Sequence, residues 1–345
     1  MTRHVLVARQ DSMGDVLLAG PAVRAVAAEA GRVTLLCGPR GRAAAELLPG
    51  VDEVVVAHAG WIDAEPRRVT REAVDELVDR LGDLEIDQAL VLTSFHQSPL
   101  PLALMLRMAG VPTIAAVSVD YPGSLLDIRH RVDDDVHEVE RGLSLAATLG
   151  YRLAEGDDGG LRVRLGGADV PDLEGRYVVV HPGASVPARA WAPERHGALV
   201  DVLIEGGRRV VVTGDTSERP LTSLVAGSRR PGVVDLGGRV DLAGLARVLG
   251  GAEVVVVGNT GPAHLAAAVG TPVVSLFSPV VPAVRWRPWG VAHELLGDQG
   301  AACAGSRARV CPVAGHPCLD GVSVGEVVAA VDRLAPMRTE QEVAG

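Results

Sequence analysis

The sequence predicts an α/β protein of two doubly wound domains, each with a parallel sheet between layers of helices. Its 345 residues allow about two domains at roughly 150 residues each. Apolar runs, glycine-containing turns and helical segments alternate along both halves. Continuous valine runs such as 254–257 are typical of strands covered on both faces, as in parallel sheets. The predicted class is therefore a pair of doubly wound, Rossmann-like domains facing across a cleft.

We expect the first domain to comprise residues 1–165. Short apolar runs predict its strands, and apolar residues three or four positions apart predict its helices. A turn at 10–14 separates the first strand from its helix, and Gly150 ends the last helix. In chain order, strands are predicted at 4–8, 33–37, 53–57, 88–92 and 113–117, and helices at 15–30, 42–48, 69–81, 99–108 and 137–149.

The second domain is expected at residues 166–345. The segment 151–174 is rich in glycine and aspartate and shows little periodicity, so it is interpreted as the link between the domains. The alternation of strands and helices then restarts. Strands are predicted at 177–181, 209–213, 233–235, 253–257 and 272–277, and helices at 193–205, 217–226, 242–249, 262–269 and 324–335.

Charge and composition exclude several classes of protein. The chain has 33 cationic residues, all arginine, against 43 acidic ones, which gives a formal net charge of −10. An acidic surface with 3% aromatic residues is unsuited to nucleic-acid binding. The apolar run at 1–8 is too short for a signal peptide, and no stretch reaches the roughly 18 apolar residues of a membrane span. We therefore expect a soluble cytoplasmic protein, with peripheral contact to the cytoplasmic face of a membrane left open.

Candidate ligand loops follow the predicted strands, because open α/β sheets bind ligands beyond the carboxyl ends of their strands. The first loop is RQDSMGD at 9–15, in which Asp15 falls in the first turn of a helix. A carboxylate there can act as a base facing a ligand. It can equally well only stabilise the helix dipole.

Three further loops lie in the second half. They are HPGAS at 181–185, VVTGD at 211–215 with Glu218 close behind, and the segment 258–272. In the last, Pro262 opens a helix, whose N-terminus offers N–H groups and a dipole to an anion. His264 in its first turn is either a ligand-binding residue or a structural hydrogen-bonding one.

Familiar motifs for other chemistries are missing from the sequence. It contains no phosphate-binding GxxxxGK[ST], no GxGxxG after the first strand, no HExxH, and no nucleophile elbow, which is a GxSxG directly after a predicted strand. The spacing of Cys303, Cys311, His316 and Cys318 is not that of a zinc ribbon. We predict no metal site, although binding of a metal by these four residues stays open.

Taken together and in order, these loops resemble glycosyltransferase family 9, the ADP-heptose heptosyltransferases of lipopolysaccharide core synthesis. Five segments carry the resemblance: SMGDVLLAGPAV, HEVERGLSLAATLG, HPGAS, ARAWAPERHGALV and NTGPAHLAAAVGTPVVSLF. They begin at residues 12, 137, 181, 188 and 259, and the resemblance covers nearly the whole chain.

The resemblance implies a GT-B enzyme that inverts the anomeric centre without a metal or a separate cofactor. The first domain would bind a glycan, glycolipid or natural-product acceptor, with Asp15 as the general base. The second would bind a nucleotide sugar, with ADP-heptose as the expected donor. The residues implied are Ser12, Met13 and Gly14 in the acceptor-side loop, and Gly183, Arg189, Gly214, Glu218, Asn259, Thr260, Gly261 and His264 at the donor.

Two positions depart from the family pattern. Asn259 stands where the family usually has aspartate, and Arg189 where it tends to have lysine. The donor sugar is accordingly less defined than the type of reaction. A catalytically silent sugar-nucleotide-binding protein and a GT-B nucleotide-sugar epimerase are the alternatives.

Overall fold

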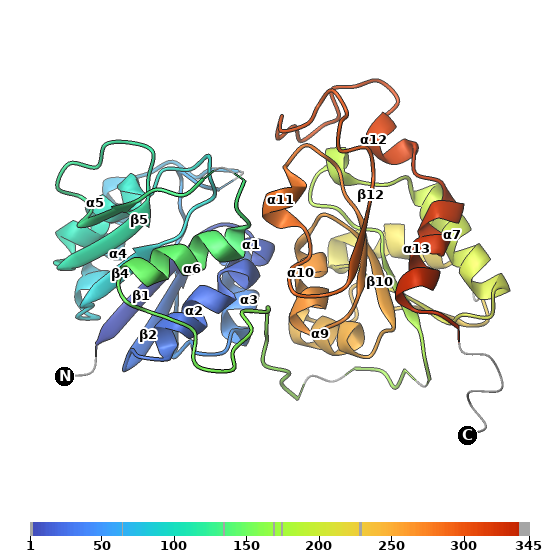
Figure 1. Cartoon of the computed structure of the whole chain (residues 1–345), viewed down its shortest axis with the longest axis horizontal. Coiled ribbons are helices and arrows are strands. Elements are labelled where there is room, and N and C mark those ends of the chain that lie inside the picture. The colour runs from blue at the N-terminus through green and yellow to red at the C-terminus, as the bar shows by residue number, and fades with distance from the viewer. Residues whose placement is uncertain are drawn as a thin grey trace. The chain divides into compact units, whose positions relative to one another are not determined.

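The computed structural model describes residues 3–63, 65–133, 135–167, 170–173, 175–227 and 230–337. The chain divides into two compact units, Met1–Arg164 (unit 1) and Leu165–Gly345 (unit 2). Each contains a six-stranded parallel sheet with helices packed on it (Figure 1). The predicted α/β class with parallel sheets is confirmed.

The sheet of unit 1 has the strand order β3-β2-β1-β4-β5-β6. In β1 and β4, Ala8 is paired with Val91, which brings the ends of these two strands to the same edge. Every predicted strand of this half is present, and β6 at the edge was missed. The strands are β1 His4–Arg9, β2 Arg32–Cys37, β3 Glu53–Val56, β4 Gln88–Val91, β5 Thr113–Val117 and β6 Ile128–His130.

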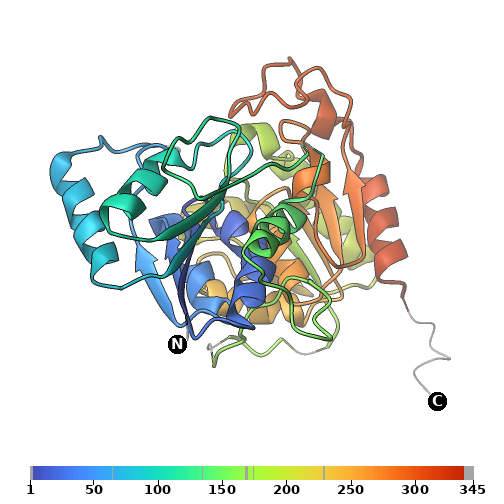
Figure 2. The ribbon, with the colours of Figure 1, turned by 60° about the vertical axis from the view of Figure 1, so that its left-hand side comes forward.

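Helices cover both faces of this sheet. The α4 and α5 helices pack on the face that carries Leu6, Ala8 and Leu36. The α2 and α6 helices lie side by side, as Figures 1 and 2 both show. The helices are α1 Met13–Leu18, α2 Gly20–Ala27, η1 Pro39–Gly41, α3 Arg42–Leu47, α4 Arg71–Gly82, α5 Leu100–Met108 and α6 Glu138–Thr148.

The single helix predicted over residues 15–30 is wrong, because two helices, α1 and α2, occupy this segment. Ala19 ends the first and begins the second. Pro21 follows in the first turn of α2, where its missing N–H costs nothing. In a continuous helix, the same proline would remove a hydrogen bond and clash with the preceding turn.

Unit 2 repeats this plan with the strand order β12-β11-β10-β7-β8-β9. The five predicted strands are confirmed, and the edge strand β12 was missed. The strands are β7 Val178–His181, β8 Val210–Val212, β9 Val233–Asp235, β10 Val254–Gly258, β11 Val273–Leu276 and β12 His293–Leu296. The helices are η2 Pro187–Arg189, α7 Pro193–Glu205, η3 Thr216–Glu218, α8 Arg219–Ala226, α9 Leu242–Gly250, α10 Gly261–Ala268, α11 Ala283–Trp286, α12 Pro317–Asp320 and α13 Val324–Leu334.

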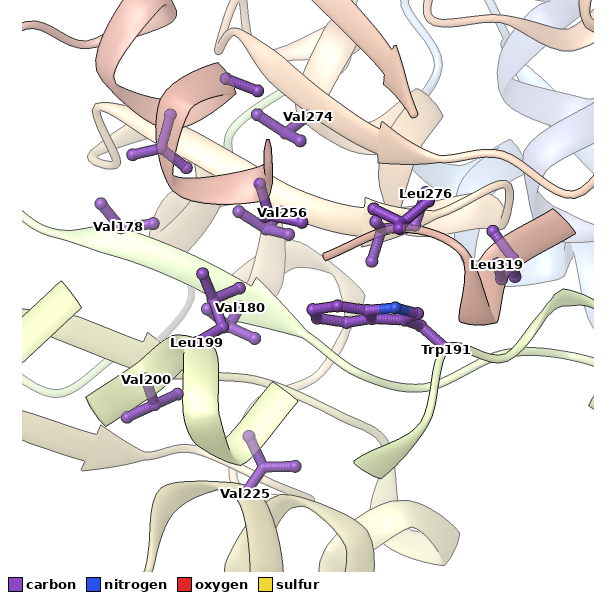
Figure 3. Packing of buried hydrophobic residues seen from close by; sticks show 14 of the residues in the cluster. Val178, Val180, Trp191, Leu199, Val200, Val225, Val256, Val274, Leu276 and Leu319 are labelled. Atoms are coloured by element: carbon purple, nitrogen blue, oxygen red, sulfur yellow. The ribbon is translucent and has the colours of Figure 1, made fainter. Parts of the chain in front are cut away.

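The core of unit 2 is built from valines of the central strands and one large aromatic ring. Figure 3 shows the Trp191 indole beside Leu276 and Leu319. The edge of the Trp191 ring also meets His196, with 4.9 Å between ring centroids. This cluster fixes the segment between β7 and α7.

In the described part of the chain, no helix has the length and apolar character needed to cross a membrane.

One ion pair of unit 1 offers a test of the fold away from any ligand loop. Arg24 donates two hydrogen bonds to Asp157, at 2.7 and 2.9 Å, and the Asp157 side chain is only 11% exposed. Hydrogen bonding by Arg24 lowers the pKa of Asp157 from 3.8 to about 2. A lowered pKa means that the stabilisation is present above pH 4 and is lost as the pH falls toward 2.

We therefore predict that Asp157→Asn lowers the free energy of unfolding by about 1–2 kcal/mol at pH 7, with a smaller difference at pH 3. Urea unfolding at both pH values measures this. Asp75→Asn, in the exposed pair with Arg71, is the control and should change stability by less than about 0.5 kcal/mol. Equal effects of the two variants would contradict the prediction.

Candidate functional site

A single buried arginine organises the carboxyl edge of the sheet in unit 1. Arg9, at the end of β1, is 4% exposed and lies within ion-pair distance of three carboxylates. Its Nε is 2.9 Å from Asp11, its Nη2 is 2.9 Å from Asp15, and its Nη1 is 3.1 Å from Glu138. Nη2 also donates to the Ser94 hydroxyl at 2.9 Å. One guanidinium thus joins β1, α1, the loop after β4 and the start of α6.

The charges of this cluster depend on one another. Burial opposes the charge of Arg9, but the three carboxylates outweigh it and raise the pKa of Arg9 above its usual range. Burial also raises the pKa of Asp11 to about 6, although Arg9 and Gln97 favour its charged form. Arg9 therefore stays charged at all ordinary pH values, whereas Asp11 takes up a proton just below neutral pH.

Asp15 is held at both of its carboxylate oxygens. Arg9 donates to Oδ1, and the Ser12 hydroxyl donates to Oδ2 at 2.7 Å. The Asp15 side chain is 18% exposed and lines a pocket with Arg9, Glu138 and Arg141. The carboxylate is thus oriented by the protein and still reachable.

The loop before Asp15 is shorter than predicted. Ser12 is the extended N-cap residue of α1, and Met13 and Gly14 already lie in the first helical turn. The turn predicted over residues 10–14 is therefore wrong at its C-terminal end. Within the described chain, the Ser12 hydroxyl bonds to Asp15 and accepts no helix N–H, so it orients a side chain instead of capping the helix.

In unit 2, polar side chains gather where β7 and β8 end. His181 Nδ1 lies 3.0 Å from the Thr213 hydroxyl, and His181 Nε2 lies 3.8 Å from Glu218. Burial lowers the pKa of His181 to about 4, so this ring is neutral at pH 7. Burial raises the pKa of Glu218, which accepts the Asp215 N–H at 2.9 Å through Oε2. The Glu218 Oε1 atom lies close to Gly183 in the loop that follows β7.

Two of the predicted glycines lie in close contact with the Glu218 side chain, and Gly214 also lies against Thr222. A Cβ atom on Gly183 would lie 2.0 Å from Glu218 Oε1. On Gly214 it would lie 2.6 Å from Thr222 Cγ2 and 3.1 Å from Glu218 Cβ. Side chains at either position would displace Glu218, so the glycines allow it to span the ends of two strands.

The α10 helix begins at the same edge, after β10. Thr260 is its N-cap residue, and Gly261 and Pro262 form the first turn. The Thr260 hydroxyl is buried and has no hydrogen-bond partner among the described residues. Because the first N–H groups of a helix lack intrahelical partners, this end can receive an anion. His264 lies one turn further along and is 6% exposed.

The Asn259 side chain forms two hydrogen bonds with the main chain of Ser278. Its amide nitrogen donates to the Ser278 carbonyl, and its amide oxygen accepts the Ser278 N–H, both at 3.3 Å. The side chain therefore ties the end of β10 to the end of β11. An aspartate, the usual family residue here, could make only the second of these bonds when ionised.

Arg189 ends η2, which lies against the end of β10. A Cβ atom on Gly258 would be 3.2 Å from the Arg189 carbonyl oxygen. Ala188, the middle residue of η2, donates its N–H to the Arg309 carbonyl at 3.0 Å. This hydrogen bond holds the short helix in place. Arg189, Asn259 and Thr260 are thus brought to one edge of unit 2.

The cysteines belong mainly to the core. Cys303 and Cys318 are buried in the hydrophobic cluster of unit 2, and the Cys311 thiol donates to the Val313 carbonyl at 3.3 Å. His316 Nε2 lies 3.2 Å from the Ala188 carbonyl. Among the described residues, no group of three or more His, Cys, Asp or Glu side chains is arranged to hold a metal ion.

Comparison with known proteins identifies the family. The model of glycosyltransferase family 9 (heptosyltransferase) matches residues 75–315, which is more than half of the chain. The chain belongs to glycosyltransferase family 9. The matched region includes Glu138, the HPGAS loop and the α10 N-terminus, whereas Asp15 lies before it.

Relatives of this family 9 chain share sequence over part of its length and fold over nearly all of it. Lipopolysaccharide heptosyltransferase 3 of Escherichia coli is 29% identical over 166 residues, 47% of this chain and 48% of that protein. The solved family 9 glycosyl transferase of Veillonella parvula has a TM-score of 0.79 at 16% identity, over 96% of this chain and 97% of that one. An E. coli heptosyltransferase with ADP-2-deoxy-2-fluoro heptose has a TM-score of 0.68 at 20% identity, over 96% and 99%.

In sequence alignments, the family 9 chain spans about half the length of the curated relatives it matches. The likeness of the solved structures establishes the GT-B fold.

Sequence reasoning missed the residues that hold the predicted ones in place. Arg9 and Glu138 are separated by 129 positions, and nothing in either local sequence links them. His181 and Thr213 were quoted within their loops but not singled out. The signal available was their position at strand ends, where parallel sheets collect ligand-facing side chains.

The double hydrogen bond of Asn259 predicts how this departure from the family pattern behaves. Asn259→Asp replaces a donor with a second acceptor facing the Ser278 carbonyl, which should cost about 1–3 kcal/mol of unfolding free energy at pH 7. The loss should shrink as the pH falls, because a protonated carboxyl can donate again. Urea unfolding between pH 7 and pH 4 measures both effects. Ser278→Ala keeps the main-chain groups and serves as the control; an unchanged stability of Asn259→Asp would disprove the pairing.

Proposed function

We propose that this family 9 member transfers a heptose or a related sugar from an ADP-sugar to a hydroxyl group of an acceptor. The acceptor is a glycan, a glycolipid or a natural product, and the reaction inverts the anomeric centre without a metal. Unit 1 binds the acceptor and unit 2 binds the donor. The observation that carries this proposal is the Asp15 carboxylate, oriented by Arg9 and Ser12 yet open to a pocket.

Asp15 supplies the base that such a reaction needs. The acceptor hydroxyl must lose its proton as its oxygen attacks the anomeric carbon. Arg9 and Ser12 each donate a hydrogen bond to one Asp15 oxygen, and a carboxylate oxygen can accept more than one hydrogen bond. The two fixed contacts hold the carboxylate in one orientation, which favours proton transfer over a defined path.

The donor side of the proposal rests on the edge of unit 2. The leaving diphosphate gains negative charge as the glycosidic bond breaks, and the α10 N-terminus at Thr260 and Gly261 can stabilise it. Arg189 adds a permanent cation, whose planar guanidinium can bind two phosphate oxygens. Glu218, held over Gly183, is an acceptor suited to ribose hydroxyls. His264 is a candidate donor to the same phosphates.

The choice of substrates follows the relatives. One solved relative holds ADP-2-deoxy-2-fluoro heptose, and the curated relative is named for lipopolysaccharide. We carry over ADP-heptose as the expected donor and a lipopolysaccharide-like glycoconjugate as one form of the acceptor. The proposed location is the cytoplasm, with peripheral membrane contact where the acceptor is lipid-linked.

Nucleotide binding tests the donor assignment. In calorimetry with EDTA present, ADP should bind, because α10 and Arg189 need no metal to hold the diphosphate. With an ADP-sugar as the donor, carried over from the relatives, ADP should bind at least tenfold more tightly than UDP or GDP. Glu218→Gln should weaken ADP binding, since the ribose would lose a charged acceptor. Tighter binding of UDP or GDP, or a strict need for Mg²⁺, would overturn this part of the proposal. Binding of ADP-heptose without transfer to any acceptor would favour the silent binding protein.

The role of Asp15 has its own test. Asp15→Asn keeps the size of the side chain and an acceptor for Arg9, but it cannot take a proton at neutral pH. Turnover should fall by about 10²–10⁴-fold, with the melting temperature within a few degrees of the parent and ADP affinity unchanged. Initial rates, thermal unfolding and calorimetry give the three readings. Asp157→Asn is the matched control and should retain turnover; near-parental turnover of Asp15→Asn would reduce Asp15 to a helix-stabilising residue.

A further inference from the structure

A long loop of unit 2 is attached to the short helix that carries Arg189. Residues 297–316, here called the brace loop, connect β12 to α12 (Figure 1). The Arg309 carbonyl accepts the Ala188 N–H at 3.0 Å, and His316 Nε2 lies 3.2 Å from the Ala188 carbonyl. The brace loop therefore satisfies both main-chain polar groups of the residue just before Arg189.

The brace loop is itself held to the body of unit 2. Cys303 is buried in the hydrophobic cluster of this unit. The Gly305 N–H donates to the Pro279 carbonyl at 2.8 Å, in the segment that follows β11. The Arg307 N–H donates to the Val280 carbonyl at the same distance. Because the loop is fixed at these points, it can in turn hold η2.

His316 provides a side-chain contact between the brace loop and η2. The contact from Arg309 is made by main-chain atoms, which a substitution leaves in place. The contact from His316 is made by the imidazole ring, so it depends on the type of residue at this position. A carbonyl oxygen can only accept a hydrogen bond, and the ring therefore donates from Nε2.

The backbone of His316 adopts a conformation that favours glycine. Its φ is 45° and its ψ is 50°, which lies in the left-handed region. A residue with a side chain is strained there, and such strain persists where surrounding contacts fix the residue. Glycine at position 316 would relax the backbone but would lose the donor to Ala188. The backbone geometry and the contact with η2 therefore favour different residues at this position.

We infer that His316 is a positioning residue for Arg189. By donating to the Ala188 carbonyl, His316 holds η2 in place and so limits the positions that the neighbouring guanidinium can occupy. The hold on η2 stands on the contacts described above. The effect on nucleotide binding rests on the proposed function, in which Arg189 binds the diphosphate of the donor.

Two substitutions of His316 separate this role from a contribution to stability. His316→Gly relieves the backbone and removes the donor, so it should melt within a few degrees of the parent but bind ADP about fivefold more weakly. His316→Gln keeps an N–H donor at a similar reach and should bind ADP within about twofold of the parent. Calorimetry and thermal unfolding measure these effects. A purely structural role would instead make the affinity follow the stability.

A double-variant cycle shows whether the effect passes through Arg189. Arg189→Gln should weaken ADP binding by about tenfold or more, because the diphosphate loses a cation. Adding His316→Gly to Arg189→Gln should weaken binding no further, since the side chain that His316 positions is already gone. Glu85→Gly is the matched control, because Glu85 also has a positive φ, of 51°, but is exposed in unit 1. It should leave ADP binding unchanged.

Hydrogen exchange in η2, followed by NMR without nucleotide, tests the hold on this helix directly. The Ala188 and Arg189 amides should exchange about tenfold faster in His316→Gly than in the parent, and at the parental rate in His316→Gln. Parental exchange in His316→Gly would overturn the inference. So would parental ADP affinity in His316→Gly beside a loss in Arg189→Gln, equal losses in His316→Gly and His316→Gln, or additive losses in the double variant.

The same measurements distinguish failure of this inference from failure of the proposed function. Faster exchange in His316→Gly, with no ADP bound by the parent, would remove the proposed donor and leave the hold of His316 on η2 in place. ADP binding that depends on Arg189 but not on His316 would remove the positioning role alone.

Discussion

The carboxyl edge of unit 1 depends on keeping one cation charged in a place that water hardly reaches. A buried guanidinium is tolerated only when carboxylates and hydrogen bonds replace the water it has lost. Arg9 meets this condition with three carboxylates from different segments, and those segments are thereby fixed to one another. The orientation of Asp15 is therefore a property of the tertiary structure, beyond what its place in a helix would provide. If one of these carboxylates were lost, the positive charge of Arg9 would be balanced only by the two that remain.

Unit 2 positions its polar groups by a different means. Its edge carries close contacts between main chain and side chain, in which glycines at 183 and 214 leave space for Glu218. The Glu218 carboxylate also belongs to a capping box with Asp215, so one side chain both caps the start of η3 and faces the loop after β7. Charge compensation governs the first unit and steric fit governs the second. The two edges should therefore tolerate different substitutions. The edge of unit 1 should be sensitive to changes in side-chain charge, and the edge of unit 2 to changes in side-chain volume.

The sequence is sufficient for the regular parts of the fold and insufficient for its edges. Apolar runs such as 254–257 identify central strands because both of their faces are buried. The edge strands Ile128–His130 and His293–Leu296 are half-buried and carry charged or polar residues, so they lack this pattern. Pro21 was a readable signal for the break between α1 and α2. The candidate residues follow from the resemblance and from strand ends, but the Arg9–Glu138 pair arises only when distant segments meet.

The alternation of Arg9, Gln10 and Asp11 has a consequence for how this edge can change in evolution. Arg9 and Asp11 belong to the charged cluster, whereas Gln10 lies beside Pro99 and Leu102 on the side covered by α5. Inserting or deleting one residue between β1 and α1 would exchange the sides of the extended residues up to α1. A neutral amide would then enter the ion-pair cluster, and a carboxylate would face the side covered by α5. Substitutions can adjust either side separately, but the length of this connection cannot drift. Change at this edge is therefore expected through point mutations, and length variation through loops elsewhere.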